Sequence, residues 1–503
     1  MPSGAQLTLH PNFPIGEVDP RLFGSFVEHL GRCVYGGIYE PGHPTATDEG
    51  FRGDVLEMVR ELGPTILRHP GGNFVSGYRW EDGVGPNSDR PRRLDLAWKT
   101  YESNEIGLNE FCSWARQAGT AVMETVNLGT RGPVEAQALV EYANHPGGSY
   151  WSDLRKSHGV EKPHDIRLWC LGNEMDGNWQ MGAKTAPEYV RVASEAAKMM
   201  RWTDSRIELV ACGSTAPNMH TYPEWDLEVV DGLYDHADYL SLHTYLDPKN
   251  DRLAFLAAPM QMEEYIRRVI SVCDVIRAKR RGKKDLHLAF DEYNVWRISD
   301  YAANLPKEWR EAPPLLEDTY DVVDALVLAT MMHVLLRQAN RVKIGCLAQL
   351  VNVIAPIRTV SGGPAWKQTI FYPFKIIARH GRGLSLQPAL RCDTVKHREL
   401  GPIPVLDAAA VLGEKSLSIF ITNRSPTRSV PLEVQLPDLR LGSLAEGLVL
   451  QNRNPRITNS ARRPDAVRPR PIRQVPVGKK GFKTLLPPLS WSWLEIPLAA
   501  RRR

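Results

Sequence analysis

The chain has 503 residues, which is too long for one ordinary core and fits one large domain with a smaller one. Hydrophobic residues make up 43% and charged residues 24%, a composition that excludes disordered and fibrous proteins. The formal net charge of +4 is small for this length and gives no reason to expect nucleic acid or an anionic membrane as a partner.

The N-terminal stretch MPSGAQLTLHPNFPIGEVDP lacks the basic and apolar regions of a secretory signal. No stretch approaches the roughly 20 apolar residues that a membrane span needs. The seven cysteines are odd in number and include no C-x-x-C pair, so we expect reduced thiols in a cytoplasmic protein.

Short apolar runs alternate with segments of helical period along the first three quarters of the chain. The predicted strands are 22–29, 65–70, 121–129, 166–174, 207–214, 239–245, 287–293 and 344–352. The predicted helices are 51–62, 107–119, 133–145, 186–200, 224–236, 262–280, 322–339 and 366–380, with a kink at Pro373. Eight strand–helix units predict a parallel (β/α)8 TIM barrel. An open doubly wound sheet is the alternative, which the lack of G-x-G-x-x-G after the first strand disfavours.

After about residue 380, short strands are divided by Pro, Gly and Asn, and no helix is evident. This pattern predicts a C-terminal antiparallel β-sandwich of the jelly-roll-like kind. Its expected strands are 385–392, 406–413, 416–424, 429–437, 446–452 and 489–498. Residues 1–15 hold one more strand, QLTLHP, which we expect to join the sandwich. The expected domains are therefore 1–15 with the sandwich, a catalytic barrel at 16–380, and the sandwich itself at 381–503.

Polar side chains gather at the C-terminal ends of the predicted barrel strands, where TIM barrels place their chemistry. The run LWCLGNE ends on Asn173 and Glu174, and HLAFDEY carries Glu292. Burying an isolated carboxylate is costly, so such a Glu has either a partner or a function. The other polar residues at strand ends are Glu28, His29, Arg68, His69, Asn73, Asn127, His243, Tyr245, Asp291, Gln349 and Asn352.

Glu174 and Glu292 fall on the fourth and seventh predicted strands, which face each other obliquely across the mouth of a closed ring. Glycoside hydrolysis requires such a pair, one carboxyl protonated and the other ionised. Arg68 could keep one of them charged, because a nearby guanidinium lowers a carboxylate pKa. Each residue alone could instead serve a turn, a helix cap or a salt bridge, and only the joint pattern favours a site.

Aromatic residues surround the same strand ends and could stack against sugar rings. They are Tyr78, Trp80, Trp98, Trp179 and Trp296.

Four stretches, FGSFVEHLGRCVYGGIYEPGHP, LRHPGGNFVSGY, GNEMDG and FDEYNVW, resemble the α-L-arabinofuranosidases of glycoside hydrolase family 51. The resemblance extends to LPPLSWSWLEIPL near the C-terminus. It implies a (β/α)8 barrel with a β-sandwich and a homo-hexamer. It also implies retaining, exo-acting release of terminal α-L-arabinofuranosyl residues from oligosaccharides of arabinan or arabinoxylan.

By this resemblance, Glu174 is the general acid/base and Glu292 is the nucleophile. The positions that bind the arabinofuranose or hold the nucleophile are Glu28, Arg68, Asn73, Asn173, Tyr245 and Gln349. To these substrate-binding candidates we add Trp98, Trp179, His243 and Trp296 from the strand ends and nearby loops. For a retaining enzyme, the two carboxyl groups should lie roughly 5–5.5 Å apart. The loops 75–105 and 296–318 are expected to shape what is accepted beyond the terminal arabinose.

Three other functions stay open at this stage. One is another retaining glycosidase, either a β-xylosidase or an endo-glycanase. A second is a metal-dependent hydrolase using Glu28, His29, His69, His243 and Asp291, although dispersed single histidines disfavour a metal site. A third is a sugar-binding protein without activity. We expect no metal, no cofactor and no nucleic acid, and we interpret the Arg-rich stretch 453–484 as a solvated loop or subunit contact.

Overall fold

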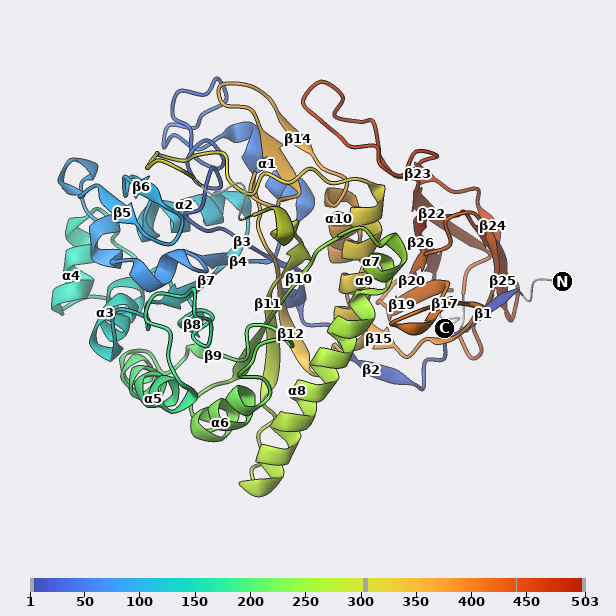
Figure 1. The fold of residues 1–503 in the computed structure, drawn as a ribbon, viewed down its shortest axis with the longest axis horizontal. Coiled ribbons are helices and arrows are strands. Elements are labelled where there is room, and N and C mark those ends of the chain that lie inside the picture. Colours follow the sequence, from blue (N-terminus) through green and yellow to red (C-terminus); the bar gives the residue numbers. More distant parts are fainter. Residues whose placement is uncertain (1–3, 302–305, 440, 500–503) are drawn as a thin grey trace.

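The structure is a computed structural model that describes residues 4–301, 306–439 and 441–499. Figure 1 shows a ring of strands surrounded by helices, with a smaller stack of strands beside it. Within the described ranges, no helix combines the length and the apolar composition needed to cross a membrane.

The larger unit is a closed barrel of eight parallel strands, counted over the described residues. The strands follow chain order around the ring, and β12 pairs with β3 to close it. They are β3 (Gly24–Phe26), β4 (Ile66–His69), β7 (Ala121–Val126), β8 (Leu168–Leu171), β9 (Glu208–Cys212), β10 (Tyr239–Leu246), β11 (His287–Val295) and β12 (Val342–Leu347). Each overlaps a predicted strand, so the TIM barrel is confirmed and the open sheet is wrong.

Apolar side chains fill the barrel below its mouth. Ile66, Met123, Val210 and Ile344 belong to one buried cluster that side chains of several strands share inside the ring. A second and larger cluster includes side chains from both the strands and the surrounding helices. Because the strands are buried on both faces, their sequences read as nearly continuous apolar runs.

The helices that cover the barrel alternate with its strands in the described part of the chain. They are α1 (Gly53–Leu62), α2 (Leu108–Ala118), α3 (Pro133–Asn144), α4 (Tyr150–Ser157), α5 (Ala186–Thr203), α6 (Glu224–Leu233), α7 (Arg252–Ala257), α8 (Pro259–Lys279), α9 (Val322–Arg337) and α10 (Phe371–His380). Helices α4 and α7 are additions that the helical period did not predict.

Two helices begin two or more residues later than predicted. Helix α1 starts at Gly53, because Phe51 and Arg52 form β-bridges to Tyr39 and Ala46. Helix α10 starts at Phe371, which places Pro373 in the first turn. A proline in the first turn loses no helical hydrogen bond, so Pro373 marks the start of the helix rather than a kink.

The smaller unit stacks two sheets over a shared core. One sheet contains, in order, β16 (Ala389–Arg391), β1 (Ala5–Thr8), β21 (Val430–Gln435) and β25 (Gly481–Leu486). The other contains β2 (Pro14–Glu17), β15 (Leu384–Leu386), β19 (Leu406–Leu412), β20 (Ser416–Asn423), β26 (Ser490–Pro497), β22 (Leu444–Leu450), β23 (Arg470–Pro471) and β24 (Val475–Pro476). One pairing departs from the antiparallel prediction, because β1 runs parallel to β21.

Three small two-stranded sheets complete the described fold. They are β5 (Arg93–Asp95) with β6 (Thr100–Glu102), β13 (Ile357–Thr359) with β14 (Ala365–Lys367), and β17 (Thr394–His397) with β18 (Gly401–Pro404). The first pair lies in the loop between β4 and α2, which is one of the loops expected to shape substrate acceptance.

A buried charge cluster joins the barrel to the sandwich. Asp407 of β19 accepts hydrogen bonds from Arg337 of α9 at 3.0 Å and from Arg424 at 3.1 Å. The ring of His333 lies 2.8 Å from the same carboxylate and accepts the indole N–H of Trp491. Burial alone would raise the pKa of Asp407, but the two arginines and His333 hold it well below its usual range.

We expect Asp407→Ala to destabilise the protein by about 3–5 kcal/mol, because two buried arginines would lose a shared partner. The measurement is the urea midpoint of global unfolding. The matched control is Asp231→Ala, which removes a partly exposed carboxylate paired with Lys279 and Arg280 and should cost less than about 1 kcal/mol. Equal midpoints for the two variants would contradict this account of the junction.

Candidate active site

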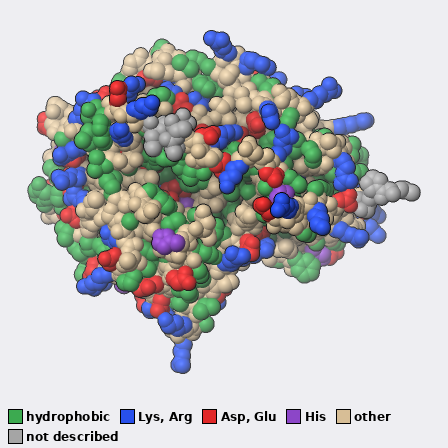
Figure 2. All heavy atoms as spheres, in the orientation of Figure 1, with side chains coloured by type: hydrophobic (Ala, Val, Ile, Leu, Met, Phe, Trp, Pro, Cys, Tyr) green, Lys and Arg blue, Asp and Glu red, His purple; other side chains and the backbone are tan. Residues whose placement is uncertain are grey.

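The candidate site lies at the mouth of the barrel, where the C-terminal ends of the strands meet. Figure 2 shows a hollow on this face with acidic side chains at its floor. Strand β10 contributes Ser241, His243 and Tyr245, which are two residues apart and therefore point to the same side of the strand. Strand β11 contributes Asp291 and Glu292 from the neighbouring position in the ring.

Glu174 reaches the site through a tight change of direction after β8. Gly172 and Glu174 both have left-handed backbone conformations, with φ of 86° and 46°. A non-glycine residue rarely adopts this conformation, and strained residues cluster at functional sites. The turn is held by Asp176, whose carboxylate accepts hydrogen bonds from Thr215 and Thr221.

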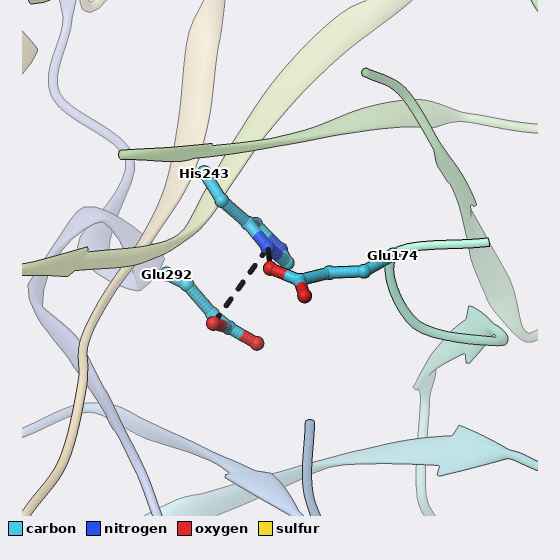
Figure 3. A group of neighbouring side chains, drawn as sticks. All are labelled: Glu174, His243 and Glu292. Atoms are coloured by element: carbon cyan, nitrogen blue, oxygen red, sulfur yellow. Dashed lines mark hydrogen bonds and ion pairs between the residues drawn. The ribbon is translucent and has the colours of Figure 1, made fainter. Parts of the chain in front are cut away.

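The carboxylates of Glu174 and Glu292 approach the same imidazole. Figure 3 shows His243 between them, with Nδ1 2.9 Å from Glu174 Oε1 and 3.6 Å from Glu292 Oε2. One oxygen of Glu174 lies within 4.8 Å of one oxygen of Glu292. Their side chains are only 9% and 5% exposed, so the two acids share a pocket largely removed from water.

The shared imidazole and the shared pocket shift the acid–base equilibria in the site. Burial lowers the pKa of His243, but Glu292, Asp291 and Glu174 outweigh burial and raise it to about 10. Burial raises the pKa of Glu174, and the charge of Glu292 raises it further against the opposing hydrogen bond from His243. At neutral pH, His243 is therefore a cation between two acids.

Arg68 connects three polar groups at the floor of the site. Its guanidinium donates to Glu292 Oε1 at 2.6 Å and to Asn173 Oδ1 at 2.7 Å. Its Nε lies 3.0 Å from Asp291 Oδ2, and the side chain is only 1% exposed. The bidentate geometry of a guanidinium fits this position, since a lysine could not reach three acceptors in one plane.

Ser241 is a functional candidate that the sequence-based prediction did not include, and Asp291, predicted above at a strand end, also belongs to the site. Burial raises the pKa of Asp291, but Arg68 and His243 lower it by more, so this pKa lies below its ordinary value. Ser241 donates to Asp291 Oδ1 at 2.6 Å and lies 3.1 Å from His243 Nε2. The spacing Ser241-x-His243-x-Tyr245 was the available signal, because alternate residues of one strand face one side.

Tyr245 and Trp296 border Glu292 on the rim. The hydroxyl of Tyr245 donates to Glu292 Oε2 at 2.6 Å. The ring of Trp296 packs edge-on against Tyr245 at 5.1 Å, and its buried Nε1 has no hydrogen-bond partner among the described residues. Glu292 thus accepts hydrogen bonds at both oxygens, from Arg68 and from Tyr245.

Glu28 is the third acid of the site. Its carboxylate contacts Trp98 and Gln349, which the sequence predicted, and Phe74, which follows the predicted Asn73. Its carboxylate accepts hydrogen bonds from the backbone N–H of Phe74, from Trp98 Nε1 and from Gln349 Nε2, each at 2.9 Å. Burial raises the pKa of Glu28 to about 8, with a contribution from Glu292, although the three donors favour the charged form. Gln349 also accepts from the backbone of Glu28, so both ends of its amide are occupied.

The remaining predicted residues offer unpaired polar atoms or an exposed ring. The Nδ2 of Asn173 is buried and has no partner in the described structure, and it lies beside Glu174 in sequence. The Asn73 side chain makes no capping bond to the short helix that follows it. Trp179 is 50% exposed, and its Nε1 donates to Glu174 Oε2 at 2.8 Å.

The residues of the alternative metal site form separate groups rather than one cluster. His29 pairs with Glu102 at 2.9 Å and His69 pairs with Glu124 at 3.0 Å. Their rings lie 5.8 Å apart, whereas His243 contacts Glu174 and Glu292 instead. Among the described residues, Glu174, His243 and Glu292 are the group whose oxygen and nitrogen atoms lie close enough to hold a metal ion. A ligating imidazole needs a free lone pair, and the raised pKa of His243 opposes its loss of a proton.

Comparison with known proteins identifies relatives along the whole chain. A family model described as "Alpha-L-arabinofuranosidase 1 domain" matches residues 58–266, and one described as "Alpha-L-arabinofuranosidase C-terminal domain" matches residues 291–490. An "Intracellular exo-alpha-(1->5)-L-arabinofuranosidase" of Halalkalibacterium halodurans is 51% identical over 98% of this chain and 99% of that protein. A Bacillus subtilis protein called "Intracellular exo-alpha-(1->5)-L-arabinofuranosidase 1" is 48% identical with the same coverage of each chain.

A solved structure gives the same result for the fold. The family 51 α-L-arabinofuranosidase AbfB of Bifidobacterium longum superposes with a TM-score of 0.93 at 42% identity. The match covers 98% of this chain and 99% of that one. The likeness therefore includes both the barrel and the sandwich.

We expect the His243 ring to remain protonated at neutral pH and to lose its proton only near pH 10. The ¹⁵N shifts of its ring nitrogens measure this directly. His164 is the internal control, because burial lowers its pKa to about 3. In Glu292→Gln, the His243 value should fall, since Glu292 is the largest charge that raises it. A His243 ring that titrates near pH 6.5 would contradict the ion cluster.

Proposed function

Because the chain belongs to the α-L-arabinofuranosidases of glycoside hydrolase family 51, we propose that it cleaves terminal α-L-arabinofuranosyl residues by two displacements with retained configuration. The observation that carries this proposal is the pair of carboxylates, Glu174 and Glu292, whose oxygens approach within 4.8 Å. That separation supports attack by one carboxylate on the sugar, because an inverting enzyme needs carboxyl groups roughly 6.5–9.5 Å apart.

In the first displacement, Glu292 attacks the anomeric carbon and the glycosidic C–O bond breaks. Arg68 and Tyr245 orient Glu292 through the hydrogen bonds that each makes to one oxygen. Glu174 gives its proton to the departing oxygen, and its raised pKa favours the protonated form needed for this transfer. The products of this step are the free alcohol and a glycosyl ester on Glu292.

In the second displacement, water attacks the anomeric carbon from the face that the alcohol left, and the bond between this carbon and the Glu292 oxygen breaks. Glu174 is now a carboxylate and accepts a proton from this water. Once Glu292 carries the sugar, its charge is gone, and so is the repulsion that helped to raise the pKa of Glu174. The same residue can therefore act first as an acid and then as a base.

Several residues would hold the arabinofuranose during these steps. The unpaired Nδ2 of Asn173 is a donor for the sugar 2-hydroxyl, a contact that strengthens in the transition state. Glu28, held by Trp98 and Gln349, is an acceptor for further hydroxyls. Asn73, Trp296 and Trp179 lie in loops that follow barrel strands, as residues that contact the ends of a substrate would.

We further propose that the enzyme works inside the cell on arabinan- or arabinoxylan-derived oligosaccharides, with α-1,5-linked arabinose as one substrate. The support is that both relatives are named as intracellular exo-α-(1→5)-L-arabinofuranosidases. The proposed steps use only side chains and water, and they involve no nucleic acid or membrane.

The proposed division of the chain places the catalytic barrel at residues 16–380 and the sandwich at 381–503 with residues 1–15. Helix α10 ends at His380 and β15 begins at Leu384, which supports the second boundary. Strand β1 pairs with β16 and β21, which supports assigning the first residues to the sandwich. Strand β2 crosses the first boundary, so the division there is a convention rather than a gap.

Azide should distinguish the two glutamates. In Glu174→Ala, hydrolysis of a natural oligosaccharide should fall by about 10²–10⁴-fold, because no acid protonates the leaving oxygen. A substrate with an activated phenol should still form the ester, and azide should then release it as an arabinofuranosyl azide of retained, α configuration. In Glu292→Ala, the ester cannot form, and azide should replace the missing carboxylate to give the β product.

The measurement is NMR of the azide adduct that each variant forms. The matched control is Glu28→Ala, which removes a third buried acid of the site and should give neither azide product. A β azide from Glu174→Ala together with an α azide from Glu292→Ala would show that the two roles are reversed.

We also propose a homo-oligomer, and specifically a hexamer, from the resemblance to family 51. Light scattering at micromolar concentration should then give a mass of about six times 56.5 kDa. A mass near 56.5 kDa would refute the assembly and leave the proposed reaction unaffected, because every residue assigned to it comes from one chain.

A further inference from the structure

Trp179 is attached to the site by one polar contact. Its indole Nε1 donates to Glu174 Oε2 at 2.8 Å, yet the residue is 50% exposed. No aromatic ring packs against it in the described part of the chain. The ring instead rests on Gly177, where an added Cβ would come within 2.7 Å of ring atoms Cε2 and Cζ2. The hydrogen bond to Glu174 and the close contact with Gly177 therefore define the position of the Trp179 ring.

The two oxygens of Glu174 are not equivalent. Oε1 faces Nδ1 of His243, a cation whose side chain is only 4% exposed and which also faces Glu292. A proton on Oε1 would point at this cation, so the proton that Glu174 transfers belongs on Oε2. The N–H of Trp179 points at that same oxygen. A protonated Oε2 keeps a lone pair for the indole N–H, but a neutral hydroxyl oxygen accepts more weakly than a carboxylate oxygen, so the contact is strongest when Glu174 is ionised.

We propose that Trp179 is a positioning donor that holds Oε2 of Glu174 and binds it more strongly in the ionised form than when Oε2 carries the proton for the leaving group. This inference rests on the proposed acid/base function of Glu174 and extends it by giving Trp179 a positioning role. In the cycle, Oε2–H transfers its proton as the glycosidic bond breaks, and the indole N–H then binds the new carboxylate more strongly. When water gives a proton back to Oε2, this contact weakens again.

The sign of the effect follows from the groups that face Glu174. Burial and Glu292 of β11 raise its pKa, while His243 of β10 and Trp179 lower it. Tyr245 of β10 feels the charge of Glu174, and Arg68 of β4 reaches it only through Asn173. Loss of the Trp179 donor leaves the other groups in place, so the ionised form becomes less stable and Glu174 keeps its proton to higher pH.

The experiment compares pH profiles of kcat/KM on an arabinofuranoside with a poor leaving group. Trp179→Phe removes the N–H and keeps an aromatic ring. Gly177→Ala keeps the indole but displaces it, because the added Cβ would clash with the ring. In both variants, the basic limb should move up by about one pH unit, as expected when a carboxylate loses one neutral donor. Trp202→Phe is the matched control, because this tryptophan lies on helix α5 and is 81% exposed, and its basic limb should not move.

A second readout uses the unmodified protein. The ¹⁵N indole resonance of Trp179, assigned by its absence in Trp179→Phe, should titrate at the pH of the basic limb. A basic limb that stays fixed in both variants, or an indole signal that does not follow it, would overturn the inference. A wild-type protein without arabinofuranosidase activity would refute the proposed function itself, and with it the role given to Trp179.

Discussion

Buried acidic side chains require buried positive charge nearby, and this constraint decides the arrangement of the site. Burying an unpaired carboxylate costs far more than a fold can tolerate. Arg68 and His243 supply the two cations, one below Glu292 and one between Glu292 and Glu174. Both cations also contact Asp291, which has no exposed surface. Asp291 and Glu292 thus both contact the guanidinium of Arg68, and its planar geometry fixes where the carboxylate of Glu292 can lie.

The same constraint separates the chemistry of the two glutamates. Glu292 accepts hydrogen bonds from Arg68 and Tyr245, and both contacts suit a charged nucleophile. Glu174 receives none from arginine and sits on a turn with a left-handed backbone, closer to solvent. Burial and its charged neighbour favour its protonated form. A single pocket therefore holds one acid that is charged and one that can carry a proton, which a retaining glycosidase requires.

The barrel was predictable because its strands are buried on two faces and its helices on one, and both patterns are visible in sequence. The polar strand ends also identified the acids, since an apolar run such as LWCLGNE has few reasons to end on Glu174. Pairings between distant segments were not predictable. The sequence could not show that Gln349 is occupied by Glu28, that His69 pairs with Glu124, or that β1 runs parallel to β21. Each pairing depends on how the folded chain brings together residues that are hundreds of positions apart or that lie at the ends of neighbouring barrel strands.

The central claim is that Glu292 attacks the sugar, with its position fixed by Arg68. The most direct test is ¹H NMR of the first product when an aryl α-L-arabinofuranoside is cleaved in water containing methanol, which traps the newly formed anomeric bond. Two displacements predict methyl α-L-arabinofuranoside from the unmodified enzyme. Methyl β-L-arabinofuranoside as the first product would mean a single displacement by solvent, and Glu292 would then have no role as a nucleophile.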